Sequence, residues 1–221
     1  MIEKLGTDEA KYLSTPCDEV IEYLENMLNH NPSALTVAEV GVGYGATSVE
    51  IVKRLRQEDT FYFYSFQEEV DELYDDLKKQ EYSKCSLVPM GNSHTLYDSF
   101  CWNLGKQVID LNGKEGIFDL VYLDGAHSFL FSGLACALLK TLIREDGCLI
   151  FDDLSWSYGS SPNRNPEYEQ EKLEQFTQEQ FDTFQIQMVV AAFMDNDRDW
   201  KCERVTKRRA IYRKLPKIRK W

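Results

Sequence analysis

The sequence predicts a doubly wound α/β fold, in which helices cover both faces of a mostly parallel sheet. Short apolar runs alternate with helix-length segments from residue 35 to residue 152, as in chains built from strand–crossover–strand units. Two further strand-like segments, 200–205 and 210–213, surround a turn at Lys207-Arg208 and predict an antiparallel closing hairpin. We therefore expect a Rossmann-like sheet of seven strands, formed by a single domain over residues 1–221.

The expected elements follow from the periodicity of the apolar residues. Strands are predicted at 35–40, 60–66, 85–88, 118–124, 148–152, 200–205 and 210–213. Helices are predicted at 16–30, 48–55, 68–80, 95–104, 131–143 and 177–193. Thr15 and Pro16 are expected to open the first helix, which forms an N-terminal helical segment over residues 1–34. Thr177 and Gln180 predict a capping box for the last helix.

Composition restricts the class of protein. The 221 residues carry a formal net charge of -12, which argues against general nucleic-acid binding because that rests on neutralising phosphates. The six cysteines form no C-x-x-C pair, so we expect a reducing, cytoplasmic location and no zinc site. No apolar run approaches 18 residues, and no signal-length apolar stretch begins the chain. We therefore expect no membrane partner.

The sequence leaves the roles of two segments open. Residues 154–176 are irregular and polar, and a loop of that length beside a sheet edge favours a substrate-side lid. Within it, Trp156 and Tyr158 are candidate substrate contacts or loop packing. The basic C-terminal strand and tail, 207–221, holds eight basic and no acidic residues. It is either an interaction segment or a solvated edge strand.

A glycine-rich turn follows the first strand. The segment Glu39-Val40-Gly41-Val42-Gly43-Tyr44-Gly45 leads directly into a helix. Glycines between a strand and a helix allow the backbone to approach a ligand closely. The spacing fits a nucleotide-like cofactor without choosing between NAD and S-adenosylmethionine, and a merely tight turn is the alternative.

Acidic residues end two consecutive apolar strands of the predicted sheet. Asp124 is followed by Gly125-Ala126-His127, and Asp152-Asp153 follow the next strand along the chain. One helix separates the strands, so they are parallel and their carboxyl ends share one edge of the sheet. Carboxylates there suit Mg²⁺, and a neutral imidazole suits a general base. The structural alternatives are a loop cap for Asp153 and a scaffolding hydrogen bond for His127.

Three segments together resemble the class I S-adenosylmethionine-dependent methyltransferases: EVGVGYGATS, FDLVYLDGAHSF and GCLIFDDLSW. The resemblance covers roughly residues 36 to 213, and the closing hairpin suits that fold. Within the superfamily the chain is similar to the metal-dependent O-methyltransferases of the catechol type and the macrocin type. The sequence DGAH followed by FDD is closer to the macrocin-type sugar enzymes.

The resemblance implies a role for each site residue. Gly41, Gly43 and Gly45 would border the methionine part of S-adenosylmethionine, with Glu39 nearby. Asn92, Ser93 and His94 would lie beside the adenine. Asp124, Asp152 and Asp153 would hold Mg²⁺ or another divalent cation, Asp124 also facing the cofactor and the reaction. His127 would be the general base.

One position departs from the family. An acid at the end of the second strand usually binds both ribose hydroxyls, but Ser65 stands there, followed by Phe66, Gln67, Glu68 and Glu69. Glu68 reaching back, or weaker binding by Gln67 or Ser65, are the alternatives. Because of this departure, a non-catalytic binding or scaffold protein with the same fold is a further alternative.

The expected function is cation-dependent O-methylation of a small hydroxylated acceptor, such as a sugar or a glycosylated metabolite. Methylation of nitrogen and homo-oligomerisation are left open. An NAD-linked oxidoreductase is a weaker alternative, because no Tyr-x-x-x-Lys or comparable hydride-transfer set lies near the sheet edge.

Overall fold

The computed structural model describes residues 1–8, 10, 14–80, 82–161 and 164–217. It confirms the predicted α/β fold, with seven strands in the order β3-β2-β1-β4-β5-β7-β6. The strands are β1 Thr36–Val40, β2 Thr60–Phe66, β3 Ser86–Asn92, β4 Phe118–Leu123, β5 Ile143–Phe151, β6 Trp200–Val205 and β7 Ala210–Lys214. The α-helices are α1 Asp18–His30, α2 Ala46–Arg54, α3 Gln67–Lys79, α4 Phe100–Leu111, α5 Phe129–Leu142, α6 Pro166–Gln175, α7 Gln178–Asp182 and α8 Gln185–Phe193. Two 3₁₀ turns complete the described elements, η1 Ile2–Lys4 and η2 Tyr158–Ser160.

The sheet is parallel except at one edge. The pairs β1–β2, β2–β3, β1–β4 and β4–β5 are parallel. Strand β7 pairs antiparallel with both β5 and β6, so the predicted closing hairpin is confirmed. The chain order reverses between β1 and β4, and the crevice at such a reversal is where ligands bind in open α/β sheets.

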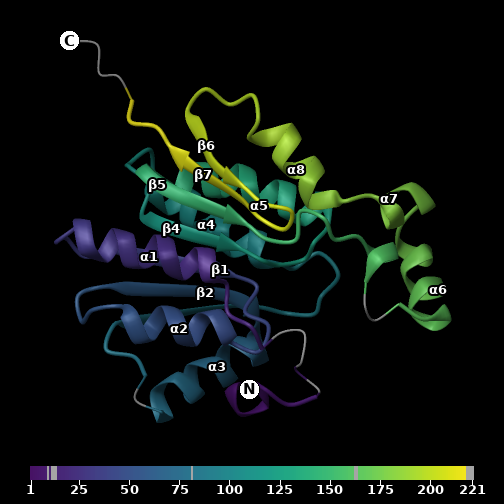
Figure 1. Ribbon diagram of the computed structural model, residues 1–221, viewed down its shortest axis with the longest axis horizontal. Helices are drawn as coiled ribbons and strands as arrows, with labels where there is room; N and C mark the ends of the chain where they lie inside the picture. Colours follow the sequence, from purple (N-terminus) through teal and green to yellow (C-terminus); the bar gives the residue numbers. More distant parts are fainter. Residues whose placement is uncertain (9, 11–13, 81, 162–163, 218–221) are drawn as a thin grey trace.

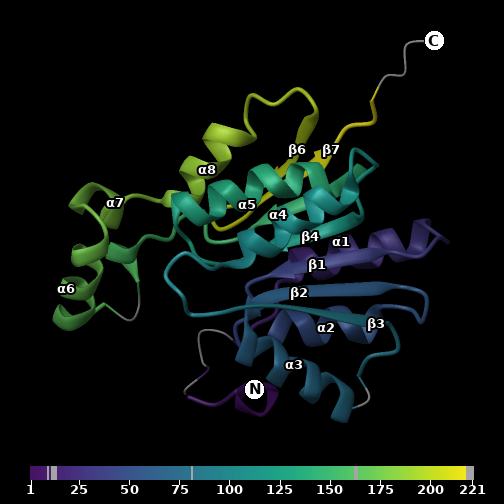
Figure 2. The ribbon, with the colours of Figure 1, turned by 180° about the vertical axis from the view of Figure 1, so that it is seen from behind.

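Helices cover both faces of the sheet (Figures 1 and 2). On one face α1, α2 and α3 bury side chains such as Leu24, Ile51 and Leu73 against the strands. On the other face α4, α5 and α8 contribute residues such as Leu104 and Leu139 to a second core. The central strands β1, β4 and β5 face apolar layers on both sides, which explains their largely apolar sequence.

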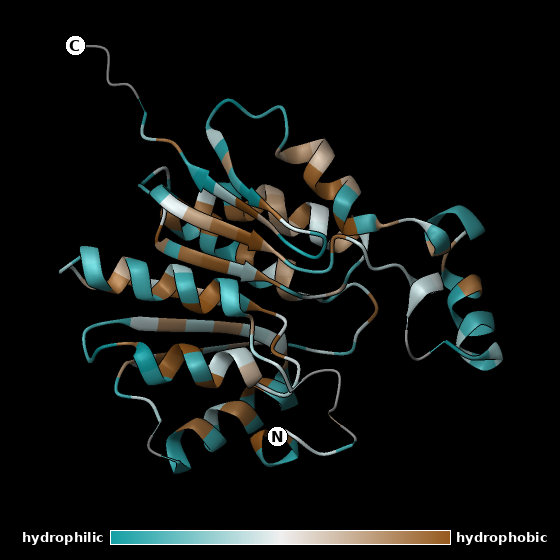
Figure 3. Cartoon of the chain, in the orientation of Figure 1, coloured by the Kyte–Doolittle hydropathy of each residue, from teal (hydrophilic) through white to brown (hydrophobic). Residues whose placement is uncertain are grey.

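The α6–α7 segment extends away from the sheet, beyond the ends of the parallel strands (Figure 1). Helix α6 buries none of its residues and is mostly hydrophilic, whereas α8 is one of the most apolar segments (Figure 3). No helix of the described residues has the length and apolarity that crossing a bilayer requires.

Four predicted helix starts differ from the structure by two residues or more: α2 and α5 begin two residues earlier than predicted, whereas α1 and α4 begin later. Helix α1 begins at Asp18 with Cys17 as its N-cap, not at Pro16, and the Cys17 amide donates to Thr47 Oγ1 at 3.0 Å. That tertiary bond outweighs the local signal of Thr15-Pro16. Helix α4 begins at Phe100, five residues later than predicted, because Ser99 caps it.

Three predicted strand and loop boundaries are also wrong. β3 continues to Asn92 through a proline, which is tolerated because β3 is an edge strand. β5 begins at Ile143, the last residue of the predicted helix 131–143 and five residues before the predicted strand start, with a register shift against β4. The segment predicted as irregular, 154–176, contains η2 and α6, the latter capped by Asn165 with Pro166 following.

The segment predicted as one last helix forms two helices in the structure, although the predicted start is right. The capping box of Thr177 and Gln180 is confirmed, but it opens only the short helix α7. Thr183 adopts an extended conformation after α7, and α8 starts at Gln185. The apolar periodicity continues across this break, which is why the pattern did not reveal it.

The turn after β1 requires glycine at position 41. Gly41 has a φ of +87°, and a Cβ there would lie 2.5 Å from the carbonyl oxygen of Asp124. The Gly41 amide donates to the Tyr64 carbonyl at 2.8 Å, so β1, β2 and β4 meet around this residue. The close approach of the β1 and β4 loops depends on the missing side chain.

We expect Gly41→Ala to lower the free energy of unfolding by about 2 kcal/mol or more, because it adds both backbone strain and a clash. Gly105→Ala is the matched control. Gly105 lies inside α4 with open space at its Cβ position, so alanine should stabilise by about 0.5–1 kcal/mol. Chemical denaturation measures both. Equal effects of the two substitutions would contradict this account of Gly41.

Candidate functional site

A cavity of about 450 Å³ opens at the carboxyl ends of β1, β2, β3 and β4. Its size is within the range of cofactor sites. Its walls come from the β1 turn, the end of β2, the segment after β3 and the β4 turn. The lining residues are Gly41, Val42, Gly43, Tyr64, Ser65, Phe66, Glu69, Asn92, Ser93, His94, Thr95, Leu96, Asp98, Ser99, Phe100, Asp124, Gly125, Ala126 and Phe131.

Of the three predicted glycines, two face this cavity. Gly41 and Gly43 line it, and a Cβ at Gly43 would meet nothing within 4 Å. Gly45 instead begins α2 in a left-handed conformation and packs against Leu73. Glu39 is buried beneath the turn, where it accepts a hydrogen bond from Ser48. Glu39 and Gly45 therefore support the turn rather than line the cavity.

A carboxylate of helix α3 lies where the family usually has an acid at the end of the second strand. Ser65 lines the cavity and donates a hydrogen bond to Glu69, which lines it as well. Of the predicted alternatives, Ser65 lines the cavity, whereas Glu68 pairs with His94, the Gln67 amide donates to Asp71, and neither of these two lines it. Sequence reasoning missed Glu69. Its place depends on the turn from β2 into α3 at Gln67, which no local pattern in the sequence marks.

The far wall of the cavity carries the three residues predicted beside the adenine. Asn92, Ser93 and His94 all line it, and the His94 ring stacks on Phe66 with 4.1 Å between centroids. Asn92 Oδ1 is buried and has no hydrogen-bond partner among the described residues. Buried acceptors are rarely left unpaired. This oxygen could accept a hydrogen bond from a cofactor bound in the cavity, so the lining suits S-adenosylmethionine.

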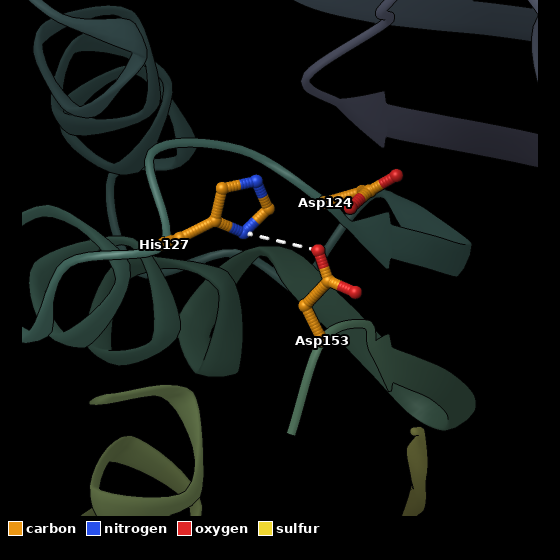
Figure 4. Close-up of side chains that lie close together, drawn as sticks. All are labelled: Asp124, His127 and Asp153. Atoms are coloured by element: carbon orange, nitrogen blue, oxygen red, sulfur yellow. Dashed lines mark ion pairs between the residues drawn. The ribbon is translucent and has the colours of Figure 1, made fainter. Parts of the chain in front are cut away.

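Beside the cavity, two carboxylates and an imidazole converge. Asp124 ends β4, His127 follows in the next turn, and Asp153 follows β5 (Figure 4). One potential ligand atom from each lies within 4.8 Å of the others. His127 Nδ1 is 3.6 Å from Asp153 Oδ2. Three side chains from two parallel strand ends thus form a group that could hold a metal ion.

The local electrostatics favour an added positive charge. Burial, then the charges of Asp152 and Asp153, raises the pKa of the Asp124 carboxyl well above its ordinary value. Burial also raises the pKa of Asp153 and lowers that of His127, which keeps the imidazole neutral. Carboxylates crowded in this way repel one another until a cation or proton is bound.

Backbone strain accompanies this group. Ala126, His127 and Asp153 have φ values of 65°, 45° and 58°, a region that residues with side chains seldom adopt. The strain at Asp153 turns the chain sharply after β5. Strained residues tend to gather at functional sites, where surrounding contacts hold them.

Asp152 is separate from the group, although it was predicted as a metal ligand. Its side chain is fully buried, and both oxygens already accept hydrogen bonds. Arg208 Nε lies 2.8 Å from Oδ1, Arg209 Nε lies 3.2 Å from Oδ2, and Tyr122 also donates to Oδ2. The structure thus gives Asp152 a structural role. Sequence reasoning missed the two arginines, whose signal was their place in the turn of a hairpin beside β5.

The aromatic pair after β5 lies against the acidic group. The Trp156 ring is 4.9 Å from the His127 ring and 4.9 Å from the Tyr158 ring. Tyr158 is buried, with its hydroxyl 3.5 Å from the Ala126 carbonyl. Tyr158 is therefore loop packing, whereas half-buried Trp156 covers the imidazole.

Comparison with known families identifies the family to which the chain belongs. Residues 38–154, which contain the glycine turn and both acidic strand ends, match the family model described as a methyltransferase domain. The chain belongs to this methyltransferase family. It is a class I S-adenosylmethionine-dependent methyltransferase, as the resemblance of its motifs predicted. No curated protein sequence matches it.

Solved structures share the fold of this methyltransferase at low sequence identity. A protein proposed to be a caffeoyl-CoA O-methyltransferase from Staphylococcus aureus is 13% identical, with a TM-score of 0.60 over 97% of this chain and 92% of its own. The O-methyltransferase TomG from Streptomyces achromogenes, solved with S-adenosylmethionine, is 12% identical, with a TM-score of 0.58 over 97% and 89%. These likenesses support the fold.

We expect Asp152→Asn to lower the free energy of unfolding by about 3 kcal/mol, because it removes the buried anion that pairs with the largely buried guanidinium of Arg209. Glu22→Gln is the control. Glu22 makes an exposed pair with Arg204 at 2.8 Å, and such pairs contribute less than about 1 kcal/mol. Urea denaturation compares the two variants. A loss of stability for Asp152→Asn no larger than the control's would contradict the proposed structural role.

Glu39 should make stability depend on pH. Burial raises the pKa of its carboxyl from 4.5 to about 8, so between these values the folded protein binds more protons at this group than the unfolded chain does. Stability from Glu39 is therefore present below pH 4.5 and is lost as pH rises towards 8. Glu39→Gln should gain stability relative to the parent over this window. Thermal or urea unfolding at several pH values tests it, and a constant difference between the two proteins would contradict it.

Proposed function

We propose that this methyltransferase transfers the methyl group of S-adenosylmethionine to a hydroxyl of a small acceptor, with the help of a divalent cation. The observation that carries the proposal is the convergence of Asp124, His127 and Asp153 beside the cofactor cavity. Asp124 belongs to both, since it lines the cavity as well. An acceptor hydroxyl held at this group would therefore lie next to the bound cofactor.

The donor atoms fit a hard divalent cation. Asp124 and Asp153 would hold it through their carboxylates, which suit both Mg²⁺ and Mn²⁺. When bound there, such a cation lowers the pKa of a coordinated hydroxyl. The raised pKa values of the two carboxyls, caused first by burial and then by neighbouring negative charges, support the fit, because a bound cation would stabilise the ionised carboxylates.

His127 is proposed as the general base. Its lowered pKa keeps the ring neutral near pH 7, and Asp153 faces Nδ1 and orients it. Nε2, the other ring nitrogen, would accept the hydroxyl proton. The acceptor oxygen then bonds to the methyl carbon as the carbon–sulfur bond breaks, which leaves S-adenosylhomocysteine. Holding the oxygen and the methyl group in line contributes most to the rate of such a transfer.

The acceptor is proposed to be a small hydroxylated molecule such as a sugar or a glycosylated metabolite. Oxygen as the acceptor atom is supported by the two solved structures named above, because TomG is an O-methyltransferase and the Staphylococcus aureus protein is proposed to be one. We further propose a cytoplasmic location, consistent with six free cysteines. The net charge of -12 disfavours a nucleic-acid substrate.

Cation dependence can be tested directly. We expect methyl transfer from S-adenosylmethionine to a panel of sugars and diols to be lost in EDTA and restored by Mg²⁺ or Mn²⁺. Asp153→Asn should weaken cation binding about 10-fold to 100-fold in calorimetry. Asp110→Asn, an exposed acid on α4, is the matched control and should bind the cation like the parent.

A second variant distinguishes the role of general base from the role of metal ligand. His127→Asn should lower kcat about 100-fold to 10,000-fold while cation affinity stays within about threefold of the parent. Activity that survives EDTA and Asp153→Asn would overturn the role of the cation. A loss of cation binding in His127→Asn as large as in Asp153→Asn would make His127 a ligand instead of the base.

A further inference from the structure

A second hollow, of about 580 Å³, lies between the start of α5, helix α8 and the α6–α7 segment. We call it the α5–α8 groove. Its apolar walls include Leu96, Phe129, Leu130, Phe131, Leu134 and Phe176. None of the described residues that line it is charged, although 28% of the chain is charged. An uncharged groove on so acidic a protein excludes ionic ligands and favours an apolar one.

The groove is continuous with the proposed active site. Leu96 and Phe131 line both the cofactor cavity and the groove. From the other side, an unbroken row of ring contacts leads from His127 through Trp156 and Tyr158 to Phe176, which lines the groove and stacks on Tyr158 at 4.5 Å. The groove therefore adjoins the cofactor cavity at Leu96 and Phe131, and a row of packed rings lies between its Phe176 wall and His127.

Buried hydrogen bonds hold the groove in shape. The Gln185 side chain is buried, and its Oε1 accepts the Phe129 amide at 2.7 Å while its Nε2 donates to the Gln180 carbonyl at 2.8 Å. One side chain thus links α5, α7 and α8. The Phe129 and Phe193 rings also meet, with centroids 6.2 Å apart. The groove exists before any ligand binds, which reduces the entropy lost on binding.

We propose that the α5–α8 groove binds the apolar portion of the methyl acceptor, so that the natural substrate is amphipathic: a hydroxylated head at Asp124, His127 and Asp153, and an alkyl or aryl tail in the groove. The proposal deepens the proposed function and rests on it. Two observations carry it: the shared walls with the cofactor cavity and the absence of charge. A freely soluble sugar with no apolar part would leave these side chains in water.

A second copy of the chain is the competing occupant. Exposed apolar side chains continue from Leu130 and Leu134 on α5 to Trp102 and Ile109 on α4, and a self-complementary face can form a symmetric dimer. The two α4 residues do not line the groove. Substitutions of these residues therefore distinguish the two occupants. An apolar tail would contact only the α5 side chains, whereas a dimer interface would contain side chains of both helices.

The test uses alkyl β-D-glucosides with one, four, six and eight carbons, below their micelle-forming concentrations. Calorimetry measures their binding to the full chain saturated with S-adenosylhomocysteine and Mg²⁺. From butyl to octyl, affinity should rise about twofold to fourfold per methylene, because each methylene leaves water. Leu134→Gln, at a side chain that is 50% exposed, should weaken octyl glucoside binding at least about 10-fold. Ile109→Gln, 76% exposed on α4, should keep the parent's slope.

Three results would overturn the proposal: no dependence on chain length in the parent, a parental slope in Leu134→Gln, or a lower oligomeric mass in both Leu134→Gln and Ile109→Gln by sedimentation. Repeating the titration in EDTA separates this proposal from the one on which it rests. If the cation has no role, methyl transfer persists in EDTA, yet the slope with chain length remains. If the groove is not a tail site, the slope is absent while cation-dependent methyl transfer persists.

Discussion

The buried carboxylate of Asp152 is the constraint on which the site depends. It ends β5 inside the protein, where an unpaired charge would be strongly unfavourable, and the arginines of the β6–β7 turn neutralise it. Arg209 also pairs with Glu19 of α1 at 2.6 Å. The Leu154 amide donates to the Arg208 carbonyl at 2.8 Å. Strand β5, the closing hairpin and α1 are thereby joined at the edge of the sheet where the cofactor cavity opens.

This arrangement separates two neighbouring acids into different roles. Because Asp152 points inward to the arginines, the left-handed backbone at Asp153 directs the next carboxylate towards His127. The pairing holds the strained residue in place, as strain at a site needs surrounding contacts to persist. On the β4 side, Gly41 has the corresponding role, because its missing side chain allows the backbone at Asp124 to approach the β1 turn closely. The acidic group is thus a product of two sheet-edge contacts that lie outside it.

The fold was predictable from the sequence because its signals are local and repeated. Strands β1, β2 and β4 are apolar runs of the right length, and the acids at 124 and 152–153 mark where two strands end. The site was predictable only in part. That Asp152 would turn to Arg208 and Arg209 depends on a strand pairing between β5 and β7, which no local pattern encodes. The same holds for Glu69, whose place in the cavity depends on where α3 begins, and for α1, whose start is fixed by Thr47 from another helix.

Arg208 links the structural role of Asp152 to the chemistry of Asp153. Its Nε lies 2.8 Å from Asp152 and 3.2 Å from Asp153, while 55% of its side chain is exposed. Three carboxylates at this edge face two guanidinium groups, one of which also serves Glu19, so the group retains excess negative charge. Arg208 can rotate into solvent at little cost, whereas the more buried Arg209 cannot. A cation at Asp124 and Asp153 would therefore compete with Arg208 alone and leave the pairing of Asp152 with Arg209 intact, which allows cation exchange without loss of the fold.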